Sequence, residues 1–289
     1  MKRVDWLPWL LLSPTVILLS VFVIYPALYS IYLSTQNVDP FTHGTIFVGW
    51  ENYLELAQSE EYWKSLKVSL LFTVYTVVPS IVVSLAVALA LNAKPYINGF
   101  FRTLFLMPVA VSTAMAAMLW IFLYNPTAGF LNYVLSTFGI EGPNWLADPT
   151  WSLVAVAIAT VWKELGFNVI FFLAGLASVP PELNEAARID GANAWQRFWR
   201  VTLPMLSPTV FFVGVVSVIH SFESFGQIHI LTRGGPAGAT NVLVYSLYRD
   251  AFENFRSGFA SAQAVILFAI ILAATFVQFR IGQKRVHYA

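Results

Sequence analysis

The stretch NEAARIDGANAWQRFWRVTLP, which runs from Asn184 to Pro204, places five charged side chains between two long apolar runs. Its first part follows two prolines and is rich in alanine, glutamate and arginine, which is typical of a short helix that begins at a proline. Gly191 then allows the backbone to turn where a continuing helix could not. A second helical piece follows, in which Trp195 and Trp199 lie four residues apart on one face. The stretch therefore predicts two short helices joined by a glycine turn.

Two interpretations of this loop stay open from its residues alone. Small alanines let another protein approach closely, and a central glutamate can accept charge-assisted hydrogen bonds, so the first helix can dock a partner protein. The second helix has an aromatic face to bury and arginines to hold in water or against lipid headgroups. From its residues alone, the loop is more typical of an amphipathic connection that lies on a membrane surface.

The composition predicts a chain that is dissolved in lipid. Only 11% of the 289 residues are charged, against roughly 25% in soluble domains. The aromatic fraction is 16% and the mean hydropathy is +0.68. A soluble domain of this size cannot hide so much apolar surface. The net charge of +1 gives no argument for a nucleic-acid partner, and the absence of cysteine excludes disulfides and thiolate chemistry.

Six apolar stretches are long enough to cross a bilayer, which takes about 20 mainly apolar residues. We predict spanning helices at approximately 10–33, 68–91, 103–124, 152–176, 205–231 and 260–279. The charged loop occupies 180–204, between the fourth and fifth spans. No internal repeat or low-complexity segment separates the spans, so residues 1–289 are expected to form a single all-α transmembrane domain. The first stretch is too long for a signal peptide and lacks a small-residue cleavage site, so we expect it to be retained.

Lysine and arginine in the loops set the expected orientation, because cytoplasmic loops carry an excess of both. One side holds ten, namely Lys2, Arg3, Lys94, Arg102, Arg188, Arg197, Arg200, Arg280, Lys284 and Arg285. The opposite side holds five, namely Lys64, Lys67, Arg233, Arg249 and Arg256. Both termini and the 180–204 loop are therefore expected to be cytoplasmic.

Several polar side chains fall inside predicted spans, where they are costly and usually face a cavity or a partner helix. They are Lys163, Glu164 and Asn168 in the fourth span and His220, Glu223 and Gln227 in the fifth. The last three follow at i, i+3 and i+7, so they share one face of a helix. Such a face can line a solute path, in which Lys163 would suit a phosphate or a polyol oxygen. The alternative, that Lys163 pairs with Glu223 or with a neighbouring subunit to fix helix packing, stays open.

The spacing of the charged loop resembles the EAA loop of the permeases of ATP-binding-cassette (ABC) importers. The matching residues are Glu185, Ala186, Ala187, Asp190, Gly191, Ala192, Leu203 and Pro204, with Val201 where isoleucine is more usual. In that family the loop forms a coupling helix that docks in a groove of the ATPase subunit. The resemblance implies that Glu185 bonds to that subunit, that Ala186 and Ala187 pack in its groove, and that Gly191 forms the turn.

Other segments resemble the sugar branch of these permeases over nearly the whole chain. They are FVGWENY (Phe47–Tyr53), FRTLFLMP (Phe101–Pro108), LWIFLYNPTAG (Leu119–Gly129), GGPAGAT (Gly234–Thr240) and SAQAVILFAIILAATFVQFR (Ser261–Arg280). Within that branch, NVDPF, VWK, VYSLYRDAF and the closing QFR are most similar to the A-type permeases of sn-glycerol 3-phosphate importers. The resemblance implies the type I ABC importer permease fold, with six transmembrane helices in the cytoplasmic membrane of a prokaryote.

The implied function is the import of a sugar or sugar-like solute by alternating access. The expected solute is sn-glycerol 3-phosphate or a glycerophosphodiester, and a di- or oligosaccharide is the alternative. The expected partners are a second permease subunit, two ATPase subunits that bind ATP and Mg²⁺, and an extracytoplasmic solute-binding protein. The chain has no G-x-x-x-x-G-K-[ST] motif, so we assign it no ATP site. Its histidines do not show metal-ligand spacing, and a permease catalyses no chemical step, so we assign it no metal, cofactor or catalytic residue. The expected path residues are Lys163, Asn168, His220, Glu223 and Gln227.

Two other classes of membrane protein are less well supported. A secondary transporter driven by protons would need a chain of titratable groups across the spans or paired inverted repeats. A membrane-embedded enzyme would need a nucleophile or a cluster of His, Asp and Glu ligands. The sequence indicates neither pattern.

Overall fold

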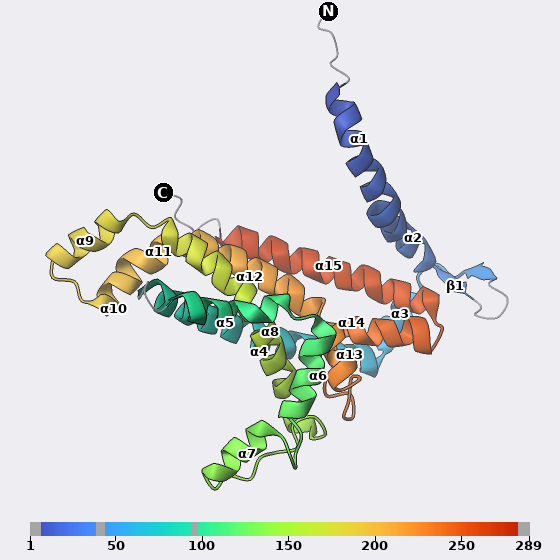
Figure 1. Cartoon of the computed structure of the whole chain (residues 1–289). Coiled ribbons are helices and arrows are strands. Elements are labelled where there is room, and N and C mark those ends of the chain that lie inside the picture. Colours follow the sequence, from blue (N-terminus) through green and yellow to red (C-terminus); the bar gives the residue numbers. More distant parts are fainter. Residues whose placement is uncertain (1–6, 39–43, 94–97, 283–289) are drawn as a thin grey trace, which may run out of the picture. The chain divides into compact units, whose positions relative to one another are not determined.

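The computed structural model describes residues 7–38, 44–93 and 98–282, and their regular structure is helical except for one small hairpin (Figure 1). The chain divides into two compact units. The first comprises the described residues of 1–63 and 246–269, and the second those of 64–245 and 270–289. Three helices begin in one unit and end in the other, namely α4 (Glu60–Ala93), α14 (Leu243–Tyr248) and α15 (Ser257–Gly282). That the whole chain forms a single domain stays a prediction.

The first unit begins with one long helical run, made of α1 (Leu7–Leu19), the π-helical turn η1 (Ser20–Ile24) and α2 (Tyr25–Leu33). The wider turn lies just before Pro26, whose missing N–H cannot continue the regular ladder of hydrogen bonds. The stretch Leu10–Leu33 is long and apolar enough to cross a membrane, and none of its most apolar window is buried within the structure.

Polar contacts hold the rest of the first unit together. A hairpin of β1 (Gln36–Val38) and β2 (Thr45–Phe47) leads to α3 (Glu51–Gln58), and η4 (Arg249–Glu253) precedes α15. On α3, the Asn52 side chain donates hydrogen bonds to the carbonyls of Ser34 at 2.9 Å and Gln36 at 3.0 Å. Farther along, Glu55 pairs with Arg256.

The second unit is a bundle around α4, α5 (Asn98–Ala110), α8 (Pro149–Ala177) and α12 (Ser207–Phe222). Two of its buried clusters contain Ala88, Phe172, Leu176, Leu206 and Val213, and Leu91, Leu165 and Val169. A Cβ added to Gly166 of α8 would lie 3.1 Å from carbonyl oxygens of Phe105 and Leu106 in α5. Close approach at a small residue is how spanning helices pack without a hydrophobic driving force between them.

Four of the six predicted spans lie on unbroken helical runs that are long and apolar enough to cross a membrane. These runs are Leu10–Leu33, Glu60–Ala93, Pro149–Ala177 and Ser257–Gly282. Two bent helix pairs raise the possible number of spans to six. The structure thus confirms an all-helical membrane protein with four to six candidate spans.

The predicted third span, 103–124, is not one straight helix. The pair Gly99–Ala110 and Thr113–Leu123 (α6) is bent by 108°. Ser112 lies at the break in extended conformation, and its hydroxyl accepts a hydrogen bond from the Met115 backbone N–H at 3.3 Å. A serine cap of this kind starts a new helix, so the apolar run continues while the chain changes direction.

The predicted fifth span, 205–231, is broken twice. The segment Ala194–Met205 meets α12 at a bend of 68°, and a proline stands in the first turn of α12. At the other end α12 stops at Phe222, and α13 (Gly226–Leu231) follows as a separate helix. Contrary to the sequence prediction, His220, Glu223 and Gln227 therefore do not share the face of one continuous helix.

The remaining helices lie at the ends of the second unit. They are α7 (Phe130–Thr137), α9 (Pro181–Ile189), α10 (Ala194–Arg197), the π-helical turn η3 (Phe198–Thr202) and α11 (Leu203–Met205). Figure 1 shows α9 to α11 projecting from one end of this unit, next to the start of α12.

Candidate functional site

A polar cavity of about 370 Å³ lies within the second unit, among the break in the third span, α8 and the break after α12. Four ionisable side chains line it, namely Lys163, Glu164, His220 and Glu223. Thr113, Ser224 and Gln227 add uncharged polar groups, and Val109 and Phe167 add apolar walls. The cavity is thus lined by opposite charges and hydrogen-bonding groups within an otherwise apolar bundle.

Lys163 reaches the cavity from α8 and is fixed by the last turn of α5. Its Nζ donates a hydrogen bond to the carbonyl oxygen of Pro108 at 2.9 Å. Carbonyls in a last helical turn have few intrahelical donors, so they are ready acceptors for a cation. An ammonium group has three donors, and this contact uses only one. Lys163 is therefore held at the cavity wall with donors left for a bound molecule.

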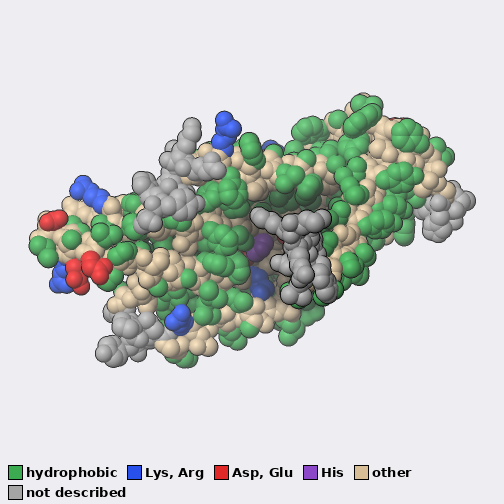
Figure 2. Space-filling model, turned by 90° about the horizontal axis from the view of Figure 1, so that it is seen from above, with side chains coloured by type: hydrophobic (Ala, Val, Ile, Leu, Met, Phe, Trp, Pro, Cys, Tyr) green, Lys and Arg blue, Asp and Glu red, His purple; other side chains and the backbone are tan. Residues whose placement is uncertain are grey.

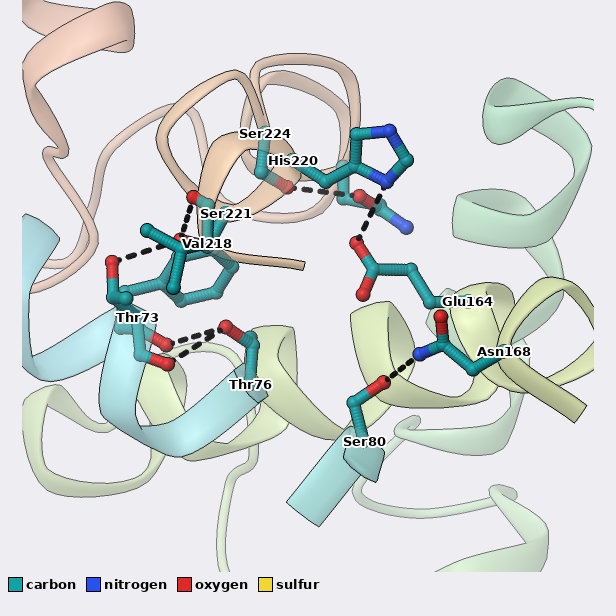
Figure 3. A network of polar contacts seen from close by, with 11 residues as sticks. Thr73, Thr76, Ser80, Glu164, Asn168, Val218, His220, Ser221 and Ser224 are labelled. Carbon is teal, nitrogen blue, oxygen red and sulfur yellow. Dashed lines mark hydrogen bonds and ion pairs between the residues drawn. The ribbon is translucent and has the colours of Figure 1, made fainter. Parts of the chain in front are cut away.

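Glu164 and His220 both line the cavity, and their side chains point toward one another (Figure 3). The distance from His220 Nδ1 to Glu164 Oε1 is 4.0 Å. The Glu164 side chain is 14% exposed and the His220 side chain is 44% exposed, so the carboxylate is the more enclosed partner. The two groups link α8 to the end of α12.

The break after α12 brings further polar groups to the cavity. Glu223 caps the end of α12 and is exposed, while Ser224 donates a hydrogen bond to the Gln227 side-chain oxygen at 3.1 Å. Gly226 lets the chain pass close to α6, because a Cβ there would lie 3.0 Å from a Thr113 methyl carbon. Non-helical backbone at membrane depth is tolerated where it lines a cavity, which is where this break occurs.

Asn168 does not line this cavity, although the sequence predicted it in the path. It is 1% exposed, and its side-chain amide donates a hydrogen bond to the Ser80 hydroxyl of α4 at 2.7 Å (Figure 3). A second polar contact joins Thr73 of α4 to Ser221 of α12 at 2.9 Å. These contacts hold helices together, so the structure places Asn168 in a helix interface.

The structure thus brings four of the five predicted path residues to one cavity. It also adds Glu164, which the sequence singled out without assigning it to the path, and Thr113, which it did not indicate. The structure shows no ion pair between the described side chains of Lys163 and Glu223; Lys163 bonds to the Pro108 carbonyl. The pairing of Lys163 with a neighbouring subunit stays a prediction. Among the residues that the structure describes, no group of three or more His, Asp or Glu could hold a metal ion.

The 180–204 loop has the predicted pair of helices and the glycine turn. Helix α9 ends at Ile189 and Asp190 is its C-cap; Gly191 then has φ of +80°, the left-handed region that glycine adopts without strain. The turn is closed by the Ala192 backbone N–H, which donates to the Ala187 carbonyl at 2.9 Å. Asn193 then starts α10 with a capping box, exchanging hydrogen bonds of 2.8 and 2.9 Å with Gln196.

Most side chains of α9 are exposed within the described chain, although Glu185 also lines a cavity with Arg197 and Thr202. Glu185 and Ala186 are exposed, and Ile189 is 87% exposed. In Figure 2 the acidic side chains visible on that face of the molecule gather at the end that α9 occupies. In contrast, Leu203 and Pro204 are half-buried and lead to the fully buried Leu206, so they join the loop to the bundle.

The comparisons with known proteins agree with one another. A family model described as "Binding-protein-dependent transport system inner membrane component" matches residues 70–288. The chain is 43% identical to the sn-glycerol-3-phosphate transport system permease protein UgpA of Agrobacterium fabrum (strain C58 / ATCC 33970), over 98% of this chain and 96% of that protein. It is 37% identical to the protein of the same name from Escherichia coli (strain UTI89 / UPEC), over 99% of this chain and 97% of that one.

Solved structures of ABC transporters are also similar to this chain. A chain of a bacterial ABC transporter involved in the import of the acidic polysaccharide alginate has a TM-score of 0.83 and 27% sequence identity, covering 97% of this chain and 96% of that one. A chain of the alginate transporter in complex with a periplasmic protein that carries an alginate pentasaccharide has a TM-score of 0.84 and 26% identity, covering 97% and 95%.

Proposed function

Because this chain belongs to the family of binding-protein-dependent inner membrane transport components, and is a permease subunit of an ABC importer, we propose that it moves sn-glycerol 3-phosphate or a glycerophosphodiester through the polar cavity. Relatives that carry the name sn-glycerol-3-phosphate permease are 37–43% identical over almost the whole chain. The observation that carries the proposal is the cavity itself, which places an ammonium group beside carboxylates among membrane-spanning helices.

The chemistry of the cavity suits a small phosphorylated polyol. The Lys163 ammonium can bind a phosphate oxygen, while Glu164 and Glu223 can accept hydrogen bonds from hydroxyl groups. The volume of about 370 Å³ falls at the lower end of the range of roughly 300–1,000 Å³ that is usual for small-molecule pockets. Ionisable residues at membrane depth are expensive, which favours a role in a solute path over a purely structural one.

A second candidate solute is a di- or oligosaccharide. The alginate transporter, similar in structure to this chain, imports an acidic polysaccharide. Carboxylates such as Glu164 and Glu223 bind sugar hydroxyls as readily as polyol hydroxyls. For a neutral saccharide the Lys163 cation would contribute less, since such a solute has no anionic group to bind.

We further propose that α9 is the coupling helix for an ATPase subunit. The exposed Glu185 would accept a charge-assisted hydrogen bond from that subunit, and the exposed Ala186 and half-buried Ala187 would allow close approach. Asp190, Gly191 and Ala192 end the helix, and Leu203 and Pro204 pass its movement to α12. The complete importer would contain a second permease subunit, two ATPase subunits that hold ATP and Mg²⁺, and an extracytoplasmic solute-binding protein.

Transport would proceed by alternating access. Closure of the ATPase pair on ATP would draw the coupling helices together and open the cavity outward, and hydrolysis would return it to face the cytoplasm. The chain is a multi-pass inner membrane protein. The proposed orientation puts the 180–204 loop and both termini in the cytoplasm, since ten of sixteen lysines and arginines would lie there.

The proposal is tested by reconstituting the complete complex in proteoliposomes and measuring ATP hydrolysis and uptake. Binding protein loaded with sn-glycerol 3-phosphate or a glycerophosphodiester should stimulate both. Stimulation only by a loaded disaccharide or oligosaccharide would favour the second candidate. Uptake driven by a proton gradient without ATP would contradict the whole assignment.

A further inference from the structure

The second half of the 180–204 loop, here called the aromatic segment (Ala194–Met205), does not continue the direction of the span that follows it. It is bent by 68° from α12. Spanning helices tilt on average by about 20° from the membrane normal. If α12 has such a tilt, the aromatic segment lies roughly 50–90° from the normal. It therefore runs closer to the plane of the membrane than to the membrane normal.

The aromatic segment cannot move far from the membrane surface, because it joins α12 directly. Trp199 precedes Ser207 by eight residues, which is about 12 Å of helix at roughly 1.5 Å per residue. At a bend of 68° that length rises only about 4–5 Å along α12. The headgroup layer on each side of a bilayer is about 5–7 Å thick. Over the range of roughly 50–90° from the normal, about 12 Å of helix changes the depth of Trp199 relative to Ser207 by at most about 8 Å. A bend at the membrane border would therefore keep Trp199 within or next to the headgroup layer.

The exposed side chains of the aromatic segment are those that favour this depth. Trp195 is 69% exposed and Trp199 is 50% exposed, and their rings pack edge to face with centroids 5.5 Å apart. Arg200 is exposed beside them. Arg197 instead donates a hydrogen bond to the Ala192 carbonyl at 2.8 Å, which ties the segment to the glycine turn. Tryptophan is enriched at membrane interfaces, because its ring is apolar and its N–H can bond to a headgroup.

We propose that the aromatic segment is an interfacial anchor, seated on the phospholipid headgroups of the cytoplasmic leaflet. Trp195 and Trp199 lie against the boundary with the acyl chains, and Arg200 binds lipid phosphate. This leaves α9, on the other side of Gly191, as the only part of the loop that faces the ATPase. The inference rests on the proposed function, which places this loop in the cytoplasm.

In this arrangement the membrane holds the aromatic segment, while α9 can move with the ATPase subunit. A movement of α9 is then transmitted to α12 through the aromatic segment, and the angle between that segment and α12 changes at Leu206. The two interpretations that the sequence left open then apply to different halves of the loop, separated at Gly191.

The absence of cysteine allows a direct test. Trp199→Cys and Ile189→Cys are each labelled with a nitroxide, and the complex is reconstituted with its partner permease in nanodiscs of phosphatidylcholine and phosphatidylglycerol. Paramagnetic relaxation by oxygen, which concentrates in lipid, is compared with relaxation by a water-soluble nickel chelate, with and without the ATPase subunits. Uptake by each complete complex checks that it is folded.

The label at position 199 should be accessible to oxygen and shielded from nickel, whether or not the ATPase is present. Adding Arg200→Gln to this variant should raise its nickel accessibility. The anchor proposal would be contradicted if the label at 199 were accessible to nickel without the ATPase and shielded from both reagents with it. The aromatic segment would then be a surface that docks the ATPase. The label at 189 should be open to nickel until the ATPase binds. If the ATPase leaves position 189 unchanged, the coupling role of α9 fails, while the result at 199 still decides the anchor.

Discussion

Lys163 lies where the bent third span meets α8, with its ammonium bonded to the Pro108 carbonyl at 2.9 Å. We expect Lys163→Met to raise the KM for sn-glycerol 3-phosphate uptake about tenfold or more, because a hydrogen bond to a charged group contributes about 1.5–3 kcal/mol and 1.4 kcal/mol is tenfold. Uptake kinetics in proteoliposomes provide the measurement. Lys67→Met is the matched control, since Lys67 is exposed and outside the cavity. An unchanged KM would show that Lys163 does not bind the solute and serves helix packing instead.

Asn168 is expected to act on stability and not on solute recognition, because its amide is buried against Ser80. Asn168→Ala and Ser80→Ala should each lower the free energy of unfolding. Their double-mutant cycle should give a coupling energy of roughly 0.5–1.7 kcal/mol, the range of hydrogen bonds between spanning helices. Unfolding of the solubilised complex measures it. A higher KM for the solute without loss of stability would instead place Asn168 in the path.

At the scale of elements, the sequence predicts the straight helices well and the breaks poorly. A count of apolar residues detects that 103–124 and 205–231 are apolar, but it does not detect a change of direction. Short polar signals inside apolar runs mark the changes of direction: Ser112 caps the start of α6, and Glu223 and Ser224 follow the end of α12. The sequence therefore predicted the cavity residues of the fifth span from a continuous helical face that the structure does not have. They meet because the chain turns after Phe222.

The glycine turn of the 180–204 loop allows a prediction about one backbone angle. A Cβ at Gly191 would meet nothing within 4 Å, so the cost of a substitution comes from φ of +80° alone. Left-handed backbone costs an L-residue roughly 1–2 kcal/mol, and a β-branched residue more. We expect Gly191→Val to abolish most stimulation of ATP hydrolysis by loaded binding protein, and Gly191→Asn to retain most of it, because asparagine tolerates this conformation.

Gly99 offers the control for this substitution. A Cβ there also meets nothing within 4 Å, but its φ is not positive. Gly99→Val should therefore leave the stimulated hydrolysis close to that of the unmodified complex. Equal loss in Gly99→Val and Gly191→Val, or full activity in Gly191→Val, would show that the turn at Gly191 does not need its left-handed conformation.

At the scale of the whole molecule, the proposed coupling role depends on a surface that another chain would cover. Most side chains of α9 are exposed within the described chain, as docking to an ATPase subunit would require. Glu185→Ala should leave basal hydrolysis by the ATPase subunits intact and reduce its stimulation by loaded binding protein about tenfold, the effect of losing one charge-assisted hydrogen bond. Glu182→Ala, in the first turn of α9, is the control. Equal effects of both substitutions would point to loss of the helix and not of one contact.

The number of spans decides on which side of the membrane each loop lies, and the 108° bend between α5 and α6 leaves two topologies possible. If the bent pair crosses the membrane, Gly99 and Ser136 lie on opposite sides. If it enters and leaves on one side, they lie on the same side, and the two chain termini lie on opposite sides. The distribution of lysine and arginine favours the crossing.

We therefore expect a membrane-impermeant maleimide, added to right-side-out vesicles, to label Ser136→Cys and to leave Gly99→Cys and Ile189→Cys unlabelled until the membrane is opened. Labelling of both Gly99→Cys and Ser136→Cys from outside would establish the re-entrant topology and contradict the six-span arrangement.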